Sequence, residues 1–386
     1  MDVDENTVAA WMAEWDGMGW HRSGTGGDHA SLRWLTTHVQ RAGQASSLHE
    51  IEFARRVSLR MAGCVVGNER FEGLPLFDAP GTDPDGVIGR LVPLGEDGVI
   101  GYTELRPDAA TTGGDPFAAV RAATKHAAIV VATQSGDGGL APLNAPRYEQ
   151  PYGPPVLQVA GRHAQMLGAL ARRGLPARLE AVVALEPATT SNLAVLLGVP
   201  SPGASALWVV TPRTSWYEST AERGGGLATW LALLHCPRLA AAGSRPALLL
   251  ATAGHEIGHL GIRHHLGALP AGSLPRLALH LGANLGASDP PMLTLRASQP
   301  AHALSMREAL SAAGYPAEAL RIEGIETAVG EARDLLASGI DVVSLVGENR
   351  MFHAPGDRWP TAMSLPRVTA VVNAVRAWVV SERSRT

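Results

Sequence analysis

The chain has 386 residues, 46% of them hydrophobic and 18% charged, with a formal net charge of −4. This length suits one large domain with a smaller one, and the scattered lysines and arginines form no basic stripe of the kind that binds nucleic acid. The acidic start lacks the features of a secretory signal, and no apolar run reaches the roughly 18 residues of a membrane span. Because 2 cysteines make no disulfide framework, we expect a cytoplasmic globular protein without nucleic-acid or membrane partners.

The chain opens with two predicted helices, residues 5–20 and 30–42, separated by a glycine-rich loop. In the first helix, Trp11 and Trp15 share one face with other apolar side chains, so packing is their expected role. The loop lacks the Lys-Ser/Thr of a phosphate-binding loop and no strand precedes it. We therefore do not expect a nucleotide site here.

Between residues 64 and 187 the pattern changes to short apolar runs separated by turns. The predicted strands are 86–94, 98–102, 127–132, 155–160 and 177–185, with helices at 116–126 and 162–173. Strands therefore dominate this part of the chain. We expect a β-rich domain over 64–187, inserted between residues 1–63 and 188–386 of a larger domain.

After the insert, buried strands and helices alternate in the manner of an α/β domain. The predicted strands are 192–197, 206–210, 247–252, 277–281 and 341–346, and the helices are 227–234, 301–313 and 366–380. Polar loops follow three of these strands, at 211–226, 255–256 and 347–360. Because ligands bind at the carboxyl edge of such sheets, we expect these loops to form the site.

An apolar run at 247–253 leads directly into His255, Glu256 and His259. One interpretation is the HExxH pattern of zinc proteases, with both histidines on one helix face. Three interspersed glycines oppose a continuous helix, because each costs about 0.8–1 kcal/mol relative to alanine. We favour a strand, a turn and a helix from about 257 to 267, which places His255 and Glu256 at the edge of the sheet and His259 on the side of a helix.

Several segments resemble the zinc aminopeptidases and their glutaminyl cyclase relatives. Residues 19–35 are similar to the opening segment and helix of that family, and residues 191–198 to the strand before its first metal ligand. Residues 64–187 resemble the protease-associated domain that many members carry. The resemblance spans nearly the whole chain and implies a three-layer αβα sandwich with a mixed, mainly parallel sheet, plus an inserted β-rich protease-associated-like domain.

On this resemblance, Glu222, Glu256 and His353 fall on the three ligands of one metal ion. The ligands of the second ion are missing, because residues 212–214 replace the His-x-Asp segment of the family and Ala283 replaces an aspartate. The three retained positions match the ligand set of single-zinc glutaminyl cyclases. The resemblance thus implies one divalent ion, zinc first, with manganese or iron as alternatives.

His255 stands where the family has its glutamate base, and a reference pKa near 6.5 suits imidazole for proton transfer at neutral pH. We expect His255 to act as the base, while a role as fourth ligand or as an inert residue stays open. Trp216, Tyr217, Met351 and Phe352 come from the ligand-bearing loops. We expect these four side chains to line a substrate pocket.

Five further residues lie near the predicted site in the chain. Glu218 and His280 are reserve ligands or acids by location, and Asp357 is expected to make a structural hydrogen bond. Arg213 and Arg223 have the neighbouring glutamates or an anionic substrate as alternative partners. Spacing along the chain does not decide between these partners.

Three functions follow as hypotheses. The first is a mononuclear metal-dependent hydrolase of an amide or peptide-like bond, acting on a small-molecule or peptide substrate. The second is an acyl-transferring or cyclising enzyme of the glutaminyl cyclase kind. The third is a non-catalytic homologue that acts as a binding protein. A homo-oligomer remains open.

Overall fold

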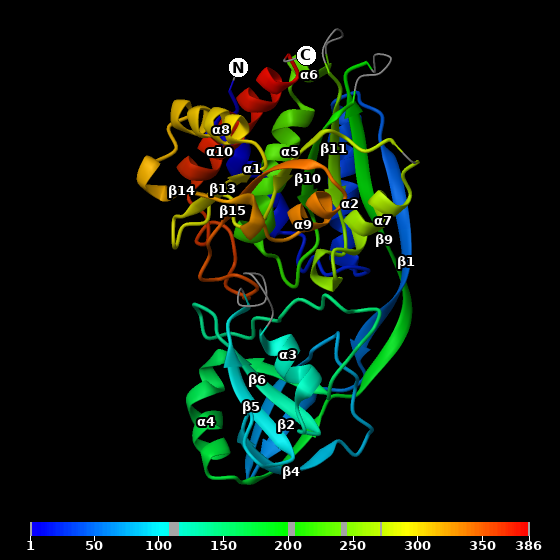
Figure 1. Ribbon diagram of the computed structural model, residues 1–386, viewed down its shortest axis with the longest axis vertical. Coiled ribbons are helices and arrows are strands. Elements are labelled where there is room, and N and C mark those ends of the chain that lie inside the picture. The colour runs from blue at the N-terminus through cyan, green and yellow to red at the C-terminus, as the bar shows by residue number, and fades with distance from the viewer. Residues whose placement is uncertain (1, 108–115, 200–204, 241–244, 271, 385–386) are drawn as a thin grey trace.

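Two long antiparallel strands, β1 (Ser47–Ser58) and β9 (Val183–Leu197), connect the two parts of the molecule. The computed structural model describes residues 2–107, 116–199, 205–240, 245–270 and 272–384. The two strands pair along the whole of β1, from Ser47 opposite Ala194 to Ser58 opposite Val183. One end of the pair belongs to an eight-stranded sheet and the other leads into a closed seven-stranded barrel (Figure 1). The chain therefore leaves the large domain along β1 and returns along β9.

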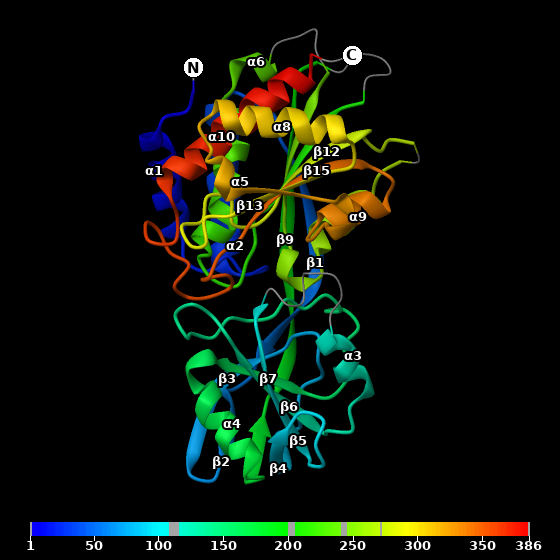
Figure 2. The same cartoon turned by 60° about the vertical axis from the view of Figure 1, so that its left-hand side comes forward.

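The sheet is mixed, as the resemblance implies. Its strand order is β1-β9-β11-β10-β12-β15-β13-β14. The six strands not yet located are β10 (Leu207–Pro212), β11 (Ala247–Thr252), β12 (Leu277–Leu281), β13 (Leu293–Ala297), β14 (Leu320–Glu323) and β15 (Asp341–Gly347). The central strands β11, β10, β12 and β15 are parallel to one another. Strand β9 runs antiparallel to β1 and β11, whereas β13 runs antiparallel to β15 and parallel to β14. The carboxyl ends of the central strands thus meet at one edge, which faces the barrel (Figure 2).

Helices cover both faces of the sheet, because alternate residues of the central strands are apolar on opposite sides. Val209 and Leu249 pack on one side, and Val210 and Leu250 on the other. The first side is covered by α1 (Glu5–Asp16), α2 (Gly26–Arg41), α5 (Gly225–Leu234), α8 (Pro300–Ala312) and α10 (Leu365–Glu382). The second side is covered by α7 (Leu260–Gly267) and α9 (Ala332–Ala337). A short helix, α6 (Pro237–Ala240), follows α5.

The inserted part is the closed barrel, with its own apolar core. Its strands are β2 (Ala62–Val66), β3 (Glu69–Pro75), β4 (Val87–Pro93), β5 (Ile100–Leu105), β6 (Ala128–Thr133), β7 (Val156–Ala160) and β8 (Pro176–Glu180). Two helices, α3 (Pro116–Ala123) and α4 (Ala164–Arg172), accompany them. The predicted strand 177–185 is divided, because β8 ends at Glu180 and β9 begins at Val183.

Two predictions at the start of the chain are wrong in their boundaries. The first helix ends at Asp16 rather than at residue 20. The second begins at Gly26 rather than at residue 30, so part of the glycine-rich loop is helical. A Cβ atom at Gly27 would lie 1.8 Å from the Trp20 carbonyl oxygen, so this glycine lets the helix pass close to the preceding loop. Within the described part of the chain, no helix has both the length and the apolar character to cross a membrane.

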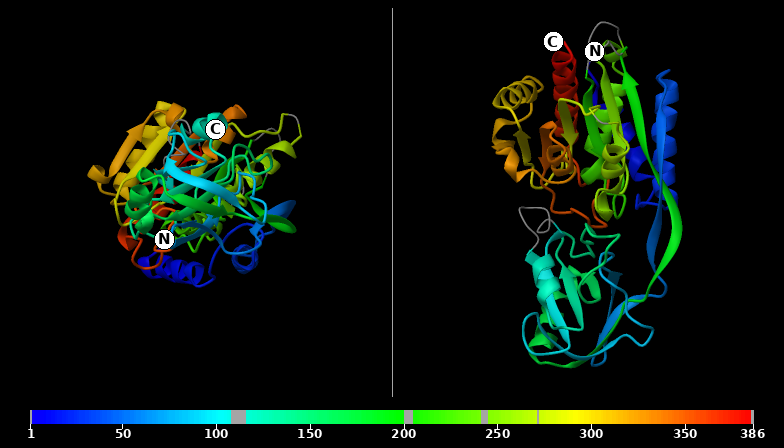
Figure 3. Two further views of the ribbon diagram at one scale, coloured as in Figure 1. Left: turned by 90° about the horizontal axis from the view of Figure 1, so that it is seen from below. Right: turned by 45° about the vertical axis from the view of Figure 1, so that its right-hand side comes forward.

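The barrel contacts the sheet domain through an apolar joint. Phe77 and Tyr148 from the insert pack with Trp216, Tyr217 and Ile257 from the sheet domain. Figure 3 shows the barrel below the carboxyl edge of the sheet, with β1 and β9 running along one side of both parts. The insert therefore lies directly against the loops in which the sequence predicts the site.

Candidate functional site

The turn after β11 separates the two histidines of the HExxH pattern. Gly254 has φ 69°, a short 3₁₀ turn covers His255–Ile257, and Gly258 and His259 have φ 85° and 57° before α7 begins at Leu260. Backbone with positive φ cannot belong to a regular α-helix. The HExxH interpretation is therefore wrong, and the predicted order of strand, turn and helix is confirmed. The helix begins at Leu260 rather than at about 257, so His259 precedes the helix instead of lying on its side.

Glu222 and Arg223 come from one turn of π-helix, Thr220–Gly224, that leads into α5. Arg223 Nη2 lies 2.6 Å from Glu222 Oε1, and the two side chains are 1% and 0% exposed. The carboxylate of Asp357 accepts hydrogen bonds from the backbone N–H groups of Ala221 (2.7 Å) and Glu222 (3.0 Å). Asp357 thus has the structural role predicted for it, and it fixes the turn that presents the ion pair.

His353 lies beside the same carboxylate. Its Nδ1 donates to the carbonyl oxygen of Pro142 at 2.6 Å, and its Nε2 lies 3.4 Å from Glu222 Oε1. Apart from these ionic contacts, Glu222 Oε1, Glu222 Oε2 and His353 Nε2 have no hydrogen-bond partner among the described residues. The insert therefore orients the His353 ring through a backbone carbonyl.

Glu256 is directed to a different set of partners. Its buried carboxylate accepts hydrogen bonds from Ser23 N (2.7 Å) and Thr214 Oγ1 (2.8 Å). Thr214 also accepts a hydrogen bond from His255 N, and its carbonyl oxygen accepts one from Arg223 Nε. Thr214 therefore connects the His-Glu turn to the arginine, and both carboxylate oxygens of Glu256 already have hydrogen-bond partners.

Three histidines lie near one another at the edge of the sheet. The ring centroids of His255 and His259 are 4.8 Å apart, and His259 Nδ1 contacts Asp334 Oδ2 at 2.7 Å. His280 Nδ1 contacts Ser344 Oγ at 2.9 Å. His255 Nδ1 and His280 Nε2 are buried and have no hydrogen-bond partner in the described part of the chain.

Burial and the Arg223 charge control the ionisation of these groups. Burial by itself would raise the pKa of the Glu222 carboxyl, but Arg223 and His353 outweigh it and lower this pKa to about 2. Burial, with the positive charge of Arg223, lowers the pKa of His255 well below its ordinary value. Burial also lowers the pKa of His280 to about 3 and raises that of Glu331 to about 8. At neutral pH, Glu222 is therefore ionised while His255 and His280 are neutral.

A cavity of about 780 Å³ opens beside these residues. Its lining includes His255, His280 and Phe352, and side chains of both the insert and the sheet domain. Met351, Trp216 and Tyr217 do not belong to the lining. Of the four residues predicted to line a pocket, Phe352 is thus the one that contacts the cavity.

Trp216 and Tyr217 belong to the joint between the two domains instead. Trp216 Nε1 donates to Asn144 Oδ1 at 3.1 Å, and the Tyr217 hydroxyl donates to the Leu140 carbonyl oxygen at 3.0 Å.

Glu331 is a site residue that the sequence does not predict. It lies 3.6 Å from His255 Nδ1 and accepts a hydrogen bond from Thr252. Glu331 precedes a short helix and belongs to no recognisable motif. The sequence shows only a carboxylate that follows a glycine, and this does not predict a site residue.

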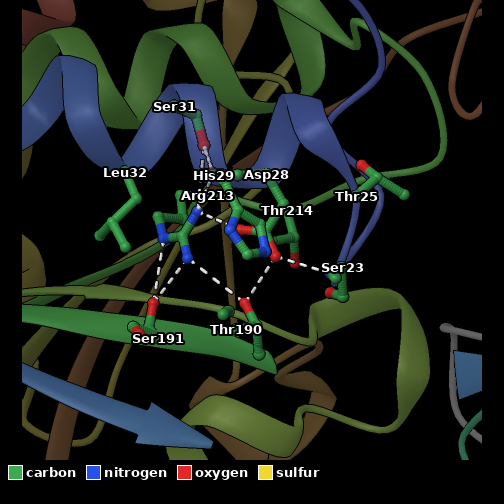
Figure 4. A network of polar contacts seen from close by, with 12 residues as sticks. Ser23, Thr25, Asp28, His29, Ser31, Leu32, Thr190, Ser191, Arg213 and Thr214 are labelled. Atoms are coloured by element: carbon green, nitrogen blue, oxygen red, sulfur yellow. Dashed lines mark hydrogen bonds and ion pairs between the residues drawn. The ribbon is translucent and has the colours of Figure 1, made fainter. Parts of the chain in front are cut away.

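Arg213 has a structural partner far away in the chain. Its guanidinium is fully buried and forms an ion pair with Asp28 of α2 (Figure 4). It also donates to Ser31 Oγ and to the Ser191 carbonyl oxygen, at 3.0 and 2.6 Å. Arg213 follows β10 directly, so this network ties α2 and β9 to the end of the strand that leads into the site.

Comparison with solved structures relates this geometry to known proteins. A zinc aminopeptidase from Bacillus subtilis superposes with a TM-score of 0.75 at 14% identity, over 99% of this chain and 96% of that one. The chain has the fold of the zinc aminopeptidases. The aminopeptidase from Aneurinibacillus sp. strain AM-1 gives a TM-score of 0.72 at 14% identity, over 99% and 94% of the two chains. The glutaminyl cyclase from Tannerella forsythia gives 0.53 at 8% identity, over 98% and 99%. No protein-family model and no curated protein matches the chain.

A catalytic zinc ion of the aminopeptidase type needs three protein ligands that converge on one point. Glu222 and His353 lie together here, but the Glu256 carboxylate is bonded to Ser23 and Thr214. Among the described residues, no group of three or more His, Cys, Asp or Glu side chains is arranged to hold a metal ion. The Arg223 guanidinium already neutralises Glu222. In this arrangement the residues do not fit a divalent ion.

Proposed function

We propose that this chain uses the aminopeptidase fold as a ligand-binding protein that works without a metal ion. The observation that carries the proposal is the buried ion pair between Glu222 and Arg223. A permanent positive charge is already bound to the carboxylate that the resemblance assigns to the metal. The arginine is part of the chain, so this charge does not depend on any cofactor.

Electrostatics supports the proposal. Two unit charges 4 Å apart repel each other by about 4 kcal/mol at an effective dielectric constant near 20, and a divalent ion doubles this energy. The single negative charge of the Glu222 carboxylate can offset one positive charge, whereas Arg223 and a divalent ion together would bring three. A metal ion beside Glu222 and His353 would therefore have to displace Arg223 from a site where that side chain is 1% exposed.

The cavity supplies the room for a ligand. Its volume of about 780 Å³ lies in the range of small-molecule sites, which is roughly 300–1,000 Å³. Asn144 and Pro146 line it from the insert, and His255 and His280 from the sheet domain. A molecule bound there would contact both domains.

Metal analysis of the purified protein tests the proposal. The protein is incubated with zinc, manganese or ferrous iron, freed of unbound metal and analysed by mass spectrometry, while hydrolysis of an aminoacyl anilide is measured on the same samples. We expect much less than one metal ion per chain and no turnover. One bound ion per chain would refute the proposal, and turnover that is lost in both Glu256→Ala and His353→Ala would support the hydrolase instead.

A second candidate function is the metal-dependent hydrolase of an amide or peptide-like bond, with His255 as base. The observation that favours it is that Glu222 Oε1 and His353 Nε2 lie 3.4 Å apart and that neither atom has a hydrogen-bond partner among the described residues. The assignment of Glu222, Glu256 and His353 as ligands stays a prediction. The metal analysis above decides between the two candidates, and the mass of any product separates hydrolysis from cyclisation.

A further inference from the structure

We infer that the cavity binds a small organic anion, a molecule with an apolar body and a carboxylate or phosphate group. The inference rests on the proposed function in one respect, namely that a ligand occupies this cavity. Five arginines contribute to the lining, against three acidic residues. The arginines are Arg106, Arg263, Arg296, Arg321 and Arg333, and the acidic residues are Glu323, Asp334 and Glu348.

The acidic side chains are already engaged by the arginines around them. Arg296 and Arg321 both contact Glu323, and Arg321 also lies 3.0 Å from Glu348. Arg263 and His259 both contact the carboxylate of Asp334. The three carboxylates are therefore already neutralised within the lining, and an excess of positive charge remains at Arg333.

Arg333 is the clearest part of this excess. It is exposed and precedes Asp334 in α9, and its guanidinium makes no ion pair or hydrogen bond with another described residue. Arg321, on β14, also lines the cavity and is 48% exposed, but it already pairs with Glu323 and Glu348. An arginine that lines a cavity without an acidic partner is suited to bind a carboxylate or a phosphate, because a guanidinium group binds both in a planar, two-point geometry.

The inner end of the cavity has a different chemistry. His280 is 1% exposed, and its Nε2 has no hydrogen-bond partner in the described part of the chain. Asn284 and Asn349 also line the cavity, and Phe352 adds an aromatic side chain. A neutral imidazole, two amides and a ring suit an uncharged, partly apolar group. The cavity therefore fits a ligand whose charged group meets Arg333 and whose apolar body contacts these uncharged side chains.

Calorimetric titration with three matched probes tests the inference. The probes are 2-naphthoate, 2-naphthyl phosphate and the neutral 2-naphthamide, which share one ring system and differ in charge. We expect at least one of the two anions to bind at least tenfold more tightly than the amide and to weaken at higher salt. The anion that binds more tightly identifies the carboxylate or the phosphate as the preferred group. Equal affinity for the amide and both anions would overturn the inference.

Charge reversal supplies the matched control. Arg333→Glu should weaken binding of the preferred anion at least tenfold, whereas Arg307→Glu, at an exposed arginine of α8 outside the cavity, should leave it unchanged. Unchanged binding in Arg333→Glu would place the anion elsewhere and refute the site.

All titrations use chelator-treated protein. If the protein takes up metal and still binds the anion, the proposed function is refuted and this inference stands. If the protein takes up no metal and binds no anion, this inference is refuted and the proposed function stands.

Discussion

The Arg223 guanidinium lies 2.6 Å from the Glu222 carboxylate, and consecutive residues of one π-helical turn supply the two charges. Because the pair is built from neighbours, no movement of one domain against the other can separate it. π-Helical turns are rare in proteins, and many of those that do occur lie at functional sites. Here the turn directs a glutamate and an arginine to the same buried point, so the positive charge beside Glu222 comes from the Arg223 side chain.

Removing the arginine should destabilise the fold. Arg223→Ala leaves the Glu222 carboxylate buried without its cation, and breaking a buried ion pair in this way costs about 3–5 kcal/mol. Urea denaturation measures the free energy of unfolding. The double variant Glu222→Leu/Arg223→Met, which removes both charges, should lose much less stability than Arg223→Ala. If Arg223→Ala cost less than about 1 kcal/mol, the carboxylate would not depend on the guanidinium.

Glu331 should give stability an inverse dependence on pH. Burial raises its pKa from 4.5 to about 8, so between these values the folded protein keeps a proton that the unfolded chain has released. The free energy of unfolding contributed by this group therefore falls as pH rises from about 4.5 to 8 and is level above that.

Comparison of Glu331→Gln with the wild type isolates this contribution. Glutamine keeps an acceptor for the Thr252 hydroxyl but carries no titrating proton. In urea titrations at pH 5, 6.5 and 8, the stability of Glu331→Gln relative to the wild type should increase with pH. Glu308→Gln on the exposed side of α8 is the control and should show no trend. A constant difference for Glu331→Gln would mean that this carboxyl is ionised throughout.

The sequence predicts the central part of the fold best. Residues 247–252 form exactly the predicted strand, because a strand covered on both faces is continuously apolar. Strand β1 was not predicted, since most of its residues are partly or fully exposed and its partner β9 lies more than a hundred residues away in the chain. Long-range pairing, and not local apolar pattern, determines such a strand. For the same reason, the predicted strand 192–197 is only the last part of β9.

The site is predictable to a smaller extent. Family resemblance predicts that Glu222 and His353 lie together, and their side chains are 3.4 Å apart. The direction of Glu256 depends on Ser23 and Thr214, which are remote in sequence and match no motif. The sequence does not distinguish between nearby glutamates and a substrate as the partner of Arg223, because spacing along a chain does not specify where a long side chain points.

Trp216 should stabilise the joint between the two domains. Its side chain is 3% exposed, stacks on Phe77 and donates to Asn144 of the insert. Trp216→Ala should cost about 3–5 kcal/mol, in line with other buried aromatic truncations, and should expose residues 136–146 to limited proteolysis. Trp20→Ala, at a side chain that is 61% exposed, is the control and should cost far less. Equal proteolysis of the two variants would show that the joint does not depend on Trp216.

Two glycines of α7 should respond to alanine with opposite signs. A Cβ atom at Gly261 would lie 2.3 Å from the Ala253 carbonyl oxygen and 2.4 Å from Asn192 Oδ1, while one at Gly267 would meet nothing within 4 Å. Gly261→Ala must push α7 away from β11 and should cost about 1–3 kcal/mol, as is typical of overpacking. Gly267→Ala should gain about 0.4–1 kcal/mol by restricting the unfolded chain. Because α7 follows the turn that carries His255, ligand affinity should fall in the first variant and not in the second. Stability changes of the same sign would contradict the close approach of helix and strand on which this turn depends.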